Sequence, residues 1–177
     1  MSETIAALRA FLLSVLPAGV EVIRAQDNRV PQPLPADFVV MTIIGRGRLA
    51  TNIVTYADGG PGLAQERHAL QPTQVTVQLD IHGPESSNTV QIISTLFRDD
   101  YGCDKFTASD YDVQPLHCSE PRQSPFLNEH QQIESRWTID AVMQANPVVT
   151  TPQDFADDLR FWPVGDVLEV DAEFPPA

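Results

Sequence analysis

The sequence predicts an α+β domain with a mostly antiparallel sheet, two main helices packed on one face of the sheet, and a long β-hairpin. Two segments repeat apolar residues with the helical period of about 3.6, and several others alternate apolar and polar residues with the strand period of two. A Gly-rich turn at Asp58–Gly62 separates two of these β-like segments. The 177 residues are the usual length of one domain, so we expect residues 1–177 to form a single unit with an extended hairpin at about 45–75.

A helix and a short strand open the predicted fold. Residues 3–16 place their apolar side chains on one helical stripe, and Pro17 ends the helix. Residues 20–24 are rich in β-branched side chains and predict a short strand. The segment 25–36 follows as a loop, because its prolines have no N–H group to donate to a sheet.

The hairpin that follows is unusual because of its length. Its arms span about 37–56 and 68–82, and Gly45 and Gly47 indicate a bend or bulge in the first arm. An arm of fifteen residues reaches roughly 50 Å, whereas strands of about five or six residues are typical. The distal part is polar or mixed, and an isolated two-stranded hairpin is marginally stable in water. We therefore expect the distal part to pack on another copy of the chain; the alternative is that it folds back onto its own sheet.

A second long helix is predicted after the hairpin. It begins near residue 86 and runs to about Tyr101, with Gly102 as the residue that ends it. This boundary leaves Asp99 and Asp100 at the negative end of the helix dipole, which is locally unfavourable.

The C-terminal part is predicted to contain mainly strands. Residues 103–128 are irregular apart from a short strand at about 113–118, and a long alternating strand covers about 131–144. Thr151 has the features of an N-cap, with a proline and an acid in the turn after it, so a short helix is expected to start there. A final strand is predicted at 164–174.

The sequence contains no recognisable catalytic, cofactor-binding or metal-binding motif. None of the four histidines has an H-x-x-x-H spacing, and neither glycine cluster matches a nucleotide-binding loop. His117 and Cys118 are adjacent, so in a strand they point to opposite faces and do not readily share a metal ion. We expect no catalytic residue, no cofactor and no metal. We expect Cys103 and Cys118 to be buried free thiols, as in a reducing compartment; the alternative is one disulfide between them.

The charge balance restricts the partners of the protein. The net charge is −13 with a pI near 4.4, which argues against a broad basic surface for nucleic acid and against binding to anionic membranes. No apolar run approaches the roughly 20 residues of a membrane span. The first residues lack the basic segment of a secretory signal, so we expect a protein that stays in the cytoplasm where it is made.

A series of short segments carries a family resemblance. They are, in order, Arg24–Pro33, Phe38–Thr42, Arg48–Asn52, Tyr56, Val77–Asp80, Gly83–Pro84, Ile93–Tyr101, Gln114–Leu116, Pro121–Gln123, Arg136–Trp137, Asn146–Val149 and Pro152–Phe155. Their order and spacing, over nearly the entire chain, resemble the phage neck terminator family, also called tail terminator or tail-completion proteins. The stretch Gly45–Gly47 departs from the family pattern and leaves the local strand geometry open.

The resemblance implies a structural virion protein and not an enzyme. Family members form a ring, usually a homohexamer, that caps the head-proximal end of the tail tube and joins it to the head connector or stopper. The resemblance implies that genome DNA passes through the lumen without specific binding, that no membrane is involved, and that assembly occurs in the host cytoplasm. The alternatives are another minor tail or head-completion protein, or an enzyme with an unrecognised site.

The polar part of the hairpin is the predicted subunit or partner interface. Its candidate residues are Arg48, Thr51, Asn52, Tyr56, Gln71 and Thr73.

Overall fold

The computed structural model describes residues 3–25, 33, 35–60, 65–124, 126–127 and 133–154. Helices and mostly antiparallel strands make up this part of the chain, which confirms the α+β class. The helices are α1 (Glu3–Val15), α2 (Ser86–Phe97) and α3 (Asp100–Thr107). The strands are β1 (Glu21–Arg24), β2 (Phe38–Arg48), β3 (Ile53–Ala57), β4 (Glu66–Leu70), β5 (Thr73–His82), β6 (Val113–Cys118), β7 (Arg122–Gln123), β8 (Phe126–Leu127), β9 (Ile133–Glu134), β10 (Arg136–Ala145) and β11 (Val148–Pro152).

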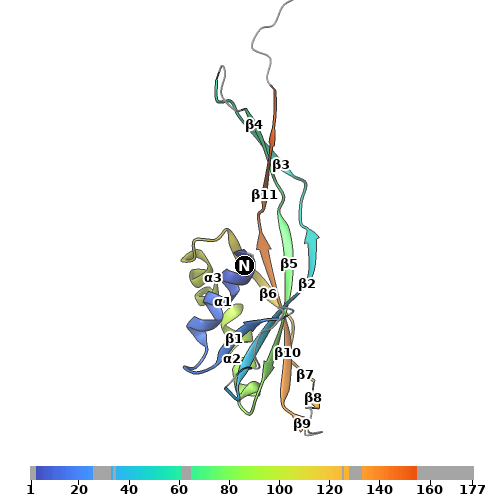
Figure 1. Ribbon diagram of the computed structural model, residues 1–177. Helices are drawn as coiled ribbons and strands as arrows, with labels where there is room; N and C mark the ends of the chain where they lie inside the picture. Colours follow the sequence, from blue (N-terminus) through green and yellow to red (C-terminus); the bar gives the residue numbers. More distant parts are fainter. Residues whose placement is uncertain are drawn as a thin grey trace, which may run out of the picture.

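The largest sheet forms the body of the protein. Its strands follow the order β1-β2-β5-β10-β6, and β7 also pairs with β10. β1 is parallel to β2, and the other neighbours are antiparallel. The three helices lie on one face of this sheet (Figure 1). A second sheet, in the order β11-β4-β3, extends away from the body at one end of the molecule (Figure 1).

Alternate residues of the central strands and one stripe of each helix form the core. Val77 of β5 and Ile139 of β10 are fully buried beneath the helices. Phe11 of α1, Phe97 of α2 and Phe106 of α3 meet with their ring centroids 5.5 to 5.9 Å apart. Each helix supplies one ring of this cluster, so burial of the rings holds the three helices together in one layer.

The predicted end of the second helix is wrong. α2 ends at Phe97, and a third helix, α3, occupies part of the segment that was expected to be irregular. Asp99 is the N-cap of α3: its backbone is extended, and its carboxylate accepts a hydrogen bond from the Tyr101 N–H at 2.9 Å. Asp99 and Asp100 therefore lie at the positive end of a helix dipole, and Gly102 lies inside α3 instead of ending α2.

The C-terminal predictions also need correction. Residues 148–152 form strand β11, so Thr151 and Pro152 belong to a strand and do not start a helix. The long strand predicted at 131–144 appears as β9 and β10. The strand predicted at 164–174 lies outside the described residues, as does most of the predicted loop 25–36.

Each arm of the predicted hairpin consists of two strands. The first arm contains β2 and β3, and the second contains β4 and β5. The bulge indicated by the glycines is present, because the register against β5 shifts between Ile43 and Gly45. Ile44 is the extra residue at this shift, and its side chain is 51% exposed.

Gly83 allows a close approach between the end of β5 and the segment before β2. Its φ is +109°, a backbone conformation that residues with a side chain rarely adopt. The Asp37 carboxylate accepts a hydrogen bond from the Glu85 N–H at 3.0 Å and thereby holds this turn. A Cβ atom at position 83 would overlap the Asp37 carboxylate and the Ala36 carbonyl oxygen.

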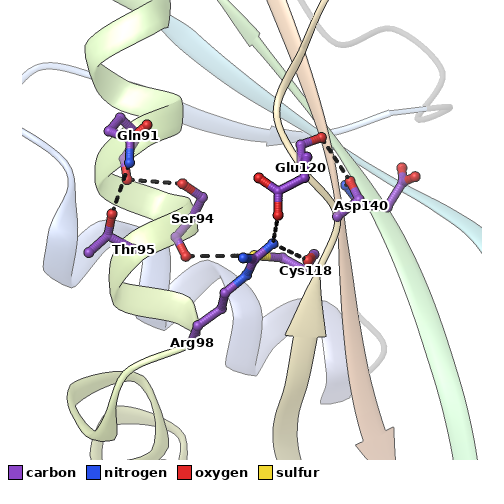
Figure 2. A network of polar contacts seen from close by, with 8 residues as sticks. Gln91, Ser94, Thr95, Arg98, Cys118, Glu120 and Asp140 are labelled. Carbon is purple, nitrogen blue, oxygen red and sulfur yellow. Dashed lines mark hydrogen bonds and ion pairs between the residues drawn. The ribbon is translucent and has the colours of Figure 1, made fainter.

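Arg98 connects the helix layer to the sheet (Figure 2). Its guanidinium donates to the Cys118 sulfur at 3.1 Å, to the Cys118 carbonyl at 2.6 Å and to the Glu120 carboxylate at 2.9 Å. The Cys118 thiol also lies 3.7 Å from the Ser94 carbonyl of α2, to which it donates. These contacts join the end of α2 to β6 and to the residues just after it.

Replacing Gly83 by alanine should destabilise the protein by about 1 to 3 kcal/mol or more, because the new Cβ meets both a positive φ and adjacent backbone. Urea unfolding followed by circular dichroism measures the change. Gly47→Ala is the matched control, since a Cβ there meets nothing within 4 Å. Equal unfolding midpoints for the two variants would contradict the tight turn at Gly83.

Replacing Arg98 by alanine should lower the free energy of unfolding by about 1 to 2 kcal/mol, because the Cys118 carbonyl and the Glu120 carboxylate lose their donor. The control is Arg46→Ala, an exposed arginine of β2, for which we expect less than about 0.5 kcal/mol. A loss for Arg98→Ala as small as that of the control would show that this connection does not stabilise the fold.

Candidate functional site

The most distinctive surface belongs to the sheet formed by β11, β4 and β3, which we call the arm. The arm continues the three middle strands of the body: β2, β5 and β10 are neighbours there, and the chain links them to β3, β4 and β11, respectively. The predicted two-stranded structure of this region is wrong, because β11 supplies a third strand. The arm extends away from the body and does not fold back onto it (Figure 1).

Two prolines mark the break between the body and the arm. Pro72 lies between β4 and β5, and Pro147 lies between β10 and β11. Proline cannot donate a ladder hydrogen bond, so regular pairing stops at this level. The carbonyl groups of the two prolines still accept hydrogen bonds. The Leu49 N–H donates to the Pro72 carbonyl at 2.9 Å, and the Gln71 N–H donates to the Pro147 carbonyl at 3.0 Å.

Apolar side chains cross the arm on both faces, next to the body. Residues paired directly across neighbouring strands lie on the same face of a sheet. One face carries the row Ile53, Leu70 and Val148, and the other carries the row Val54, Ala69 and Val149. None of the residues in the three strands of the arm is buried.

The arm therefore exposes an unusual amount of apolar surface. Ile53 is 56% exposed, Tyr56 59%, Val148 53% and Val149 62%. No described helix covers either face of the arm (Figure 1). Neighbouring exposed apolar side chains of this kind are typical of a surface that another protein covers.

Polar side chains occupy the outer half of the arm. The His68 Nδ1 atom of β4 and the Thr150 hydroxyl of β11 are 2.9 Å apart and share a hydrogen bond. The other ring nitrogen of His68 lies 3.5 Å from the Glu66 carboxylate. These contacts connect β4 with β11 by side chains, in addition to the backbone ladder.

All six predicted interface residues lie on the arm or at its junction with the body. They are Arg48 at the end of β2, Thr51 and Asn52 in the link to β3, Tyr56 in β3, Gln71 between β4 and β5, and Thr73 at the start of β5. The first four are exposed and Gln71 is half-buried. Thr73 is buried, and its hydroxyl donates to the Gln71 carbonyl at 2.9 Å.

Sequence reasoning missed the contribution of β11 to this surface. Val148 and Val149 are among its most exposed apolar residues, but the Thr-Pro pair after them resembles a helix start. The run of β-branched residues from Val148 to Thr151 was the available signal for a strand.

The described residues show no arrangement typical of catalysis or metal binding. Among them, no group of three His, Cys, Asp or Glu side chains is placed to hold a metal ion. Both cysteines are free, as expected, but only Cys118 is buried; Cys103 is exposed on α3, against the prediction. No described helix has the length and hydropathy required to span a membrane.

Two titratable side chains in the body are shifted by their surroundings. Burial raises the pKa of the Cys118 thiol, and the neighbouring Arg98 opposes this shift. The Cys118 thiol is therefore protonated at neutral pH, which is the form of an inert structural cysteine. Burial also lowers the pKa of His82, which stacks on Phe38 with ring centroids 4.6 Å apart.

The comparison with protein families agrees with the sequence resemblance. The family model of the phage neck terminator protein matches residues 2–167 of the chain. A search of curated proteins found no match. This is a family of structural proteins of the phage tail and neck. Because the match extends over nearly the whole chain, the protein belongs to the phage neck terminator protein family.

Proposed function

We propose that copies of this chain close into a ring, six by the family resemblance, that caps the head-proximal end of the tail tube. The ring joins the tube protein to the head connector or stopper, and it assembles in the host cytoplasm. The family match supports a role at the neck. The observation that carries the ring is the arm, which extends from the body and has no buried residue in any of its strands.

A neighbouring copy would cover the apolar rows of the arm. Full burial of one Val, Leu or Ile side chain is worth about 1.5 to 3 kcal/mol, so covering Ile53, Val148 and Val149 offers several kcal/mol for association. The exposed candidates Arg48, Thr51, Asn52 and Tyr56 lie on the same projection and would contact the same neighbour.

The position of the arm favours a ring over a simple dimer. The arm protrudes at one end of the molecule, away from the helices (Figure 1). An arm that contacts a different surface on its neighbour makes a head-to-tail interface, and such an interface closes when its rotation divides the circle.

The charge of the chain suits a lumen through which DNA slides. At −13 per copy, a ring of six carries about −78, so a lining that neutralises many phosphates is not expected. We propose that the genome passes through the ring without specific binding.

Another minor tail or head-completion role would use the same family features without a ring. Negative-stain images of the purified protein distinguish the two roles. Particles with a central hole support the proposed function, and particles without one at assembly concentrations count against it.

We expect the double variant Ile53→Ser, Val148→Ser to remain folded but to need at least a tenfold higher concentration for assembly. Both side chains belong to one apolar row, and their loss removes about 3 kcal/mol or more of burial from the proposed interface. Light scattering measures the mass, and circular dichroism measures the fold. The control is Leu116→Ser, which removes an exposed apolar side chain of β6 in the body. Equal assembly of the double variant and the control would argue against a contact through the arm.

The assembled protein should bind duplex DNA weakly, with a Kd above the micromolar range at about 0.1 M salt, where the Debye length is roughly 10 Å. Fluorescence anisotropy with a labelled duplex measures the affinity. Binding in the micromolar range or tighter, weakening with added salt, would reveal a basic lining and contradict a passive lumen.

A further inference from the structure

The charged residues of the arm lie in its central strand, and not in its edge strands, where soluble sheets usually place them. Soluble sheets protect their edges with charges, prolines or short strands, because an exposed edge has unpaired N–H and C=O groups. In the arm, Glu66, Arg67 and His68 all lie in the central strand β4. Both edge strands, β3 and β11, contain no charged residue. β3 also contains no proline, and the proline of β11 is its last residue, Pro152.

The edges of the body sheet are protected in the usual way. β1 has four residues, with a charged residue at each end, Glu21 and Arg24. β6 contains Pro115 beside a shift in its register with β10, and β7 is two residues long and includes Arg122. Among the strands that the structure describes, the lack of edge protection is therefore a property of the arm and not of the body sheet.

We propose that β3 of one copy pairs with β11 of the next copy, so that the arms of neighbouring copies form one continuous β-sheet. This inference rests on the proposed ring and specifies its contact. Both edge strands are five residues long, so they can pair along their full length. Because neither edge is charged, the pairing places no like charges side by side in a protein with a net charge of −13.

The strand directions within one chain determine the direction of this pairing. β3 and β11 both run antiparallel to β4, so they are parallel to each other. A rotation about an axis along the strands leaves their direction unchanged, so β3 meets the β11 of its neighbour as a parallel strand. A twofold dimer would instead bring β3 against β3 as antiparallel strands.

The number of strands is compatible with an open ring. Six copies with three strands each would give a closed barrel of eighteen strands. Barrels of about 16 to 18 strands enclose an aqueous channel, whereas those of about eight are filled by side chains or hold one small ligand.

Disulfide cross-linking in the full-length chain tests the pairing. The variant combines Thr55→Cys in β3 and Thr150→Cys in β11 with Cys103→Ser, which removes the exposed native thiol. Within one chain β4 separates the two new cysteines, so they are roughly 10 Å apart, beyond the limit of about 7 Å for a disulfide. Only cysteines in different copies can therefore join.

We expect mild oxidation to give a ladder of covalent dimers, trimers and larger species on a non-reducing gel. The register between copies decides which residue of β3 lies opposite Thr150 of the next copy. Thr150→Cys is therefore also combined in turn with Val54→Cys and Tyr56→Cys. The single-cysteine variants should stay monomeric on the gel. Dimers from Thr55→Cys alone would indicate β3 against β3 and overturn the proposal.

Light scattering of the same samples distinguishes a failure of the edge pairing from a failure of ring assembly. An assembled ring that gives no ladder in any register overturns the edge pairing and leaves the ring standing. A chain that stays monomeric at assembly concentrations overturns the proposed function itself. Cross-linking of Thr55→Cys to Val167→Cys in place of Thr150→Cys would show that the C-terminal segment takes the edge of β3, which also overturns the proposal.

A lysine on the edge provides an independent test. Thr55→Lys places a charge on β3, as natural sheets do to prevent pairing. We expect this variant to need at least a tenfold higher concentration for assembly while keeping its circular dichroism spectrum. The matched control is Thr95→Lys, at an exposed position of α2. Equal assembly of the two lysine variants would contradict a paired edge.

Discussion

Backbone hydrogen bonds, and not a side-chain core, hold the arm together. The three central strands of the body continue past the region that the helices cover, and beyond Pro72 and Pro147 no described helix lies over them (Figure 1). Ten cross-strand residue pairs, five on each side of β4, join the backbones of β3, β4 and β11. Their side chains nevertheless remain exposed on both faces, so the arm has a defined shape and little burial energy of its own.

The body supplies the stability that the arm lacks. Its helix layer is joined by the cluster of Phe11, Phe97 and Phe106, and its strands bury alternate residues beneath that layer. Arg98 connects the end of α2 to β6, and the turn at Gly83 packs against the segment before β2. The arm is built from continuations of the same strands, so the strands of the body lead directly into the arm.

Electrostatics work against assembly of this chain. Each copy carries −13, and like charges on neighbouring copies repel unless salt screens them over roughly 10 Å at about 0.1 M. An interface through the arm limits this cost, because the edge strands of the arm are uncharged and Glu66, Arg67 and His68 all lie in the central strand β4. Apolar contacts and backbone pairing, which do not depend on net charge, are the interactions such a contact would use.

The sequence by itself determined the fold class, the core strands and the absence of recognisable catalytic motifs. Alternation in the predicted strands 68–82 and 131–144 indicates which residues face the helices, since side chains in a strand point to opposite faces. The glycine bulge in β2 was also visible. Each of these features depends on a local pattern, such as a period, a turn or a backbone requirement.

The tertiary structure decided the boundaries and partners that depend on distant residues. Asp99 caps a new helix because the chain turns after Phe97, and the rings of Phe97 and Phe106 then pack together with Phe11. Residues 148–152 become a strand because β4, about 80 positions earlier, offers a ladder of hydrogen bonds. The β-branched residues from Val148 to Thr151 favour a strand, whereas the Thr-Pro pair favours a helix start, so the neighbour that the segment pairs with decides its conformation. For the same reason only the structure could show that the charges of the arm lie in its central strand and that its two edges are uncharged.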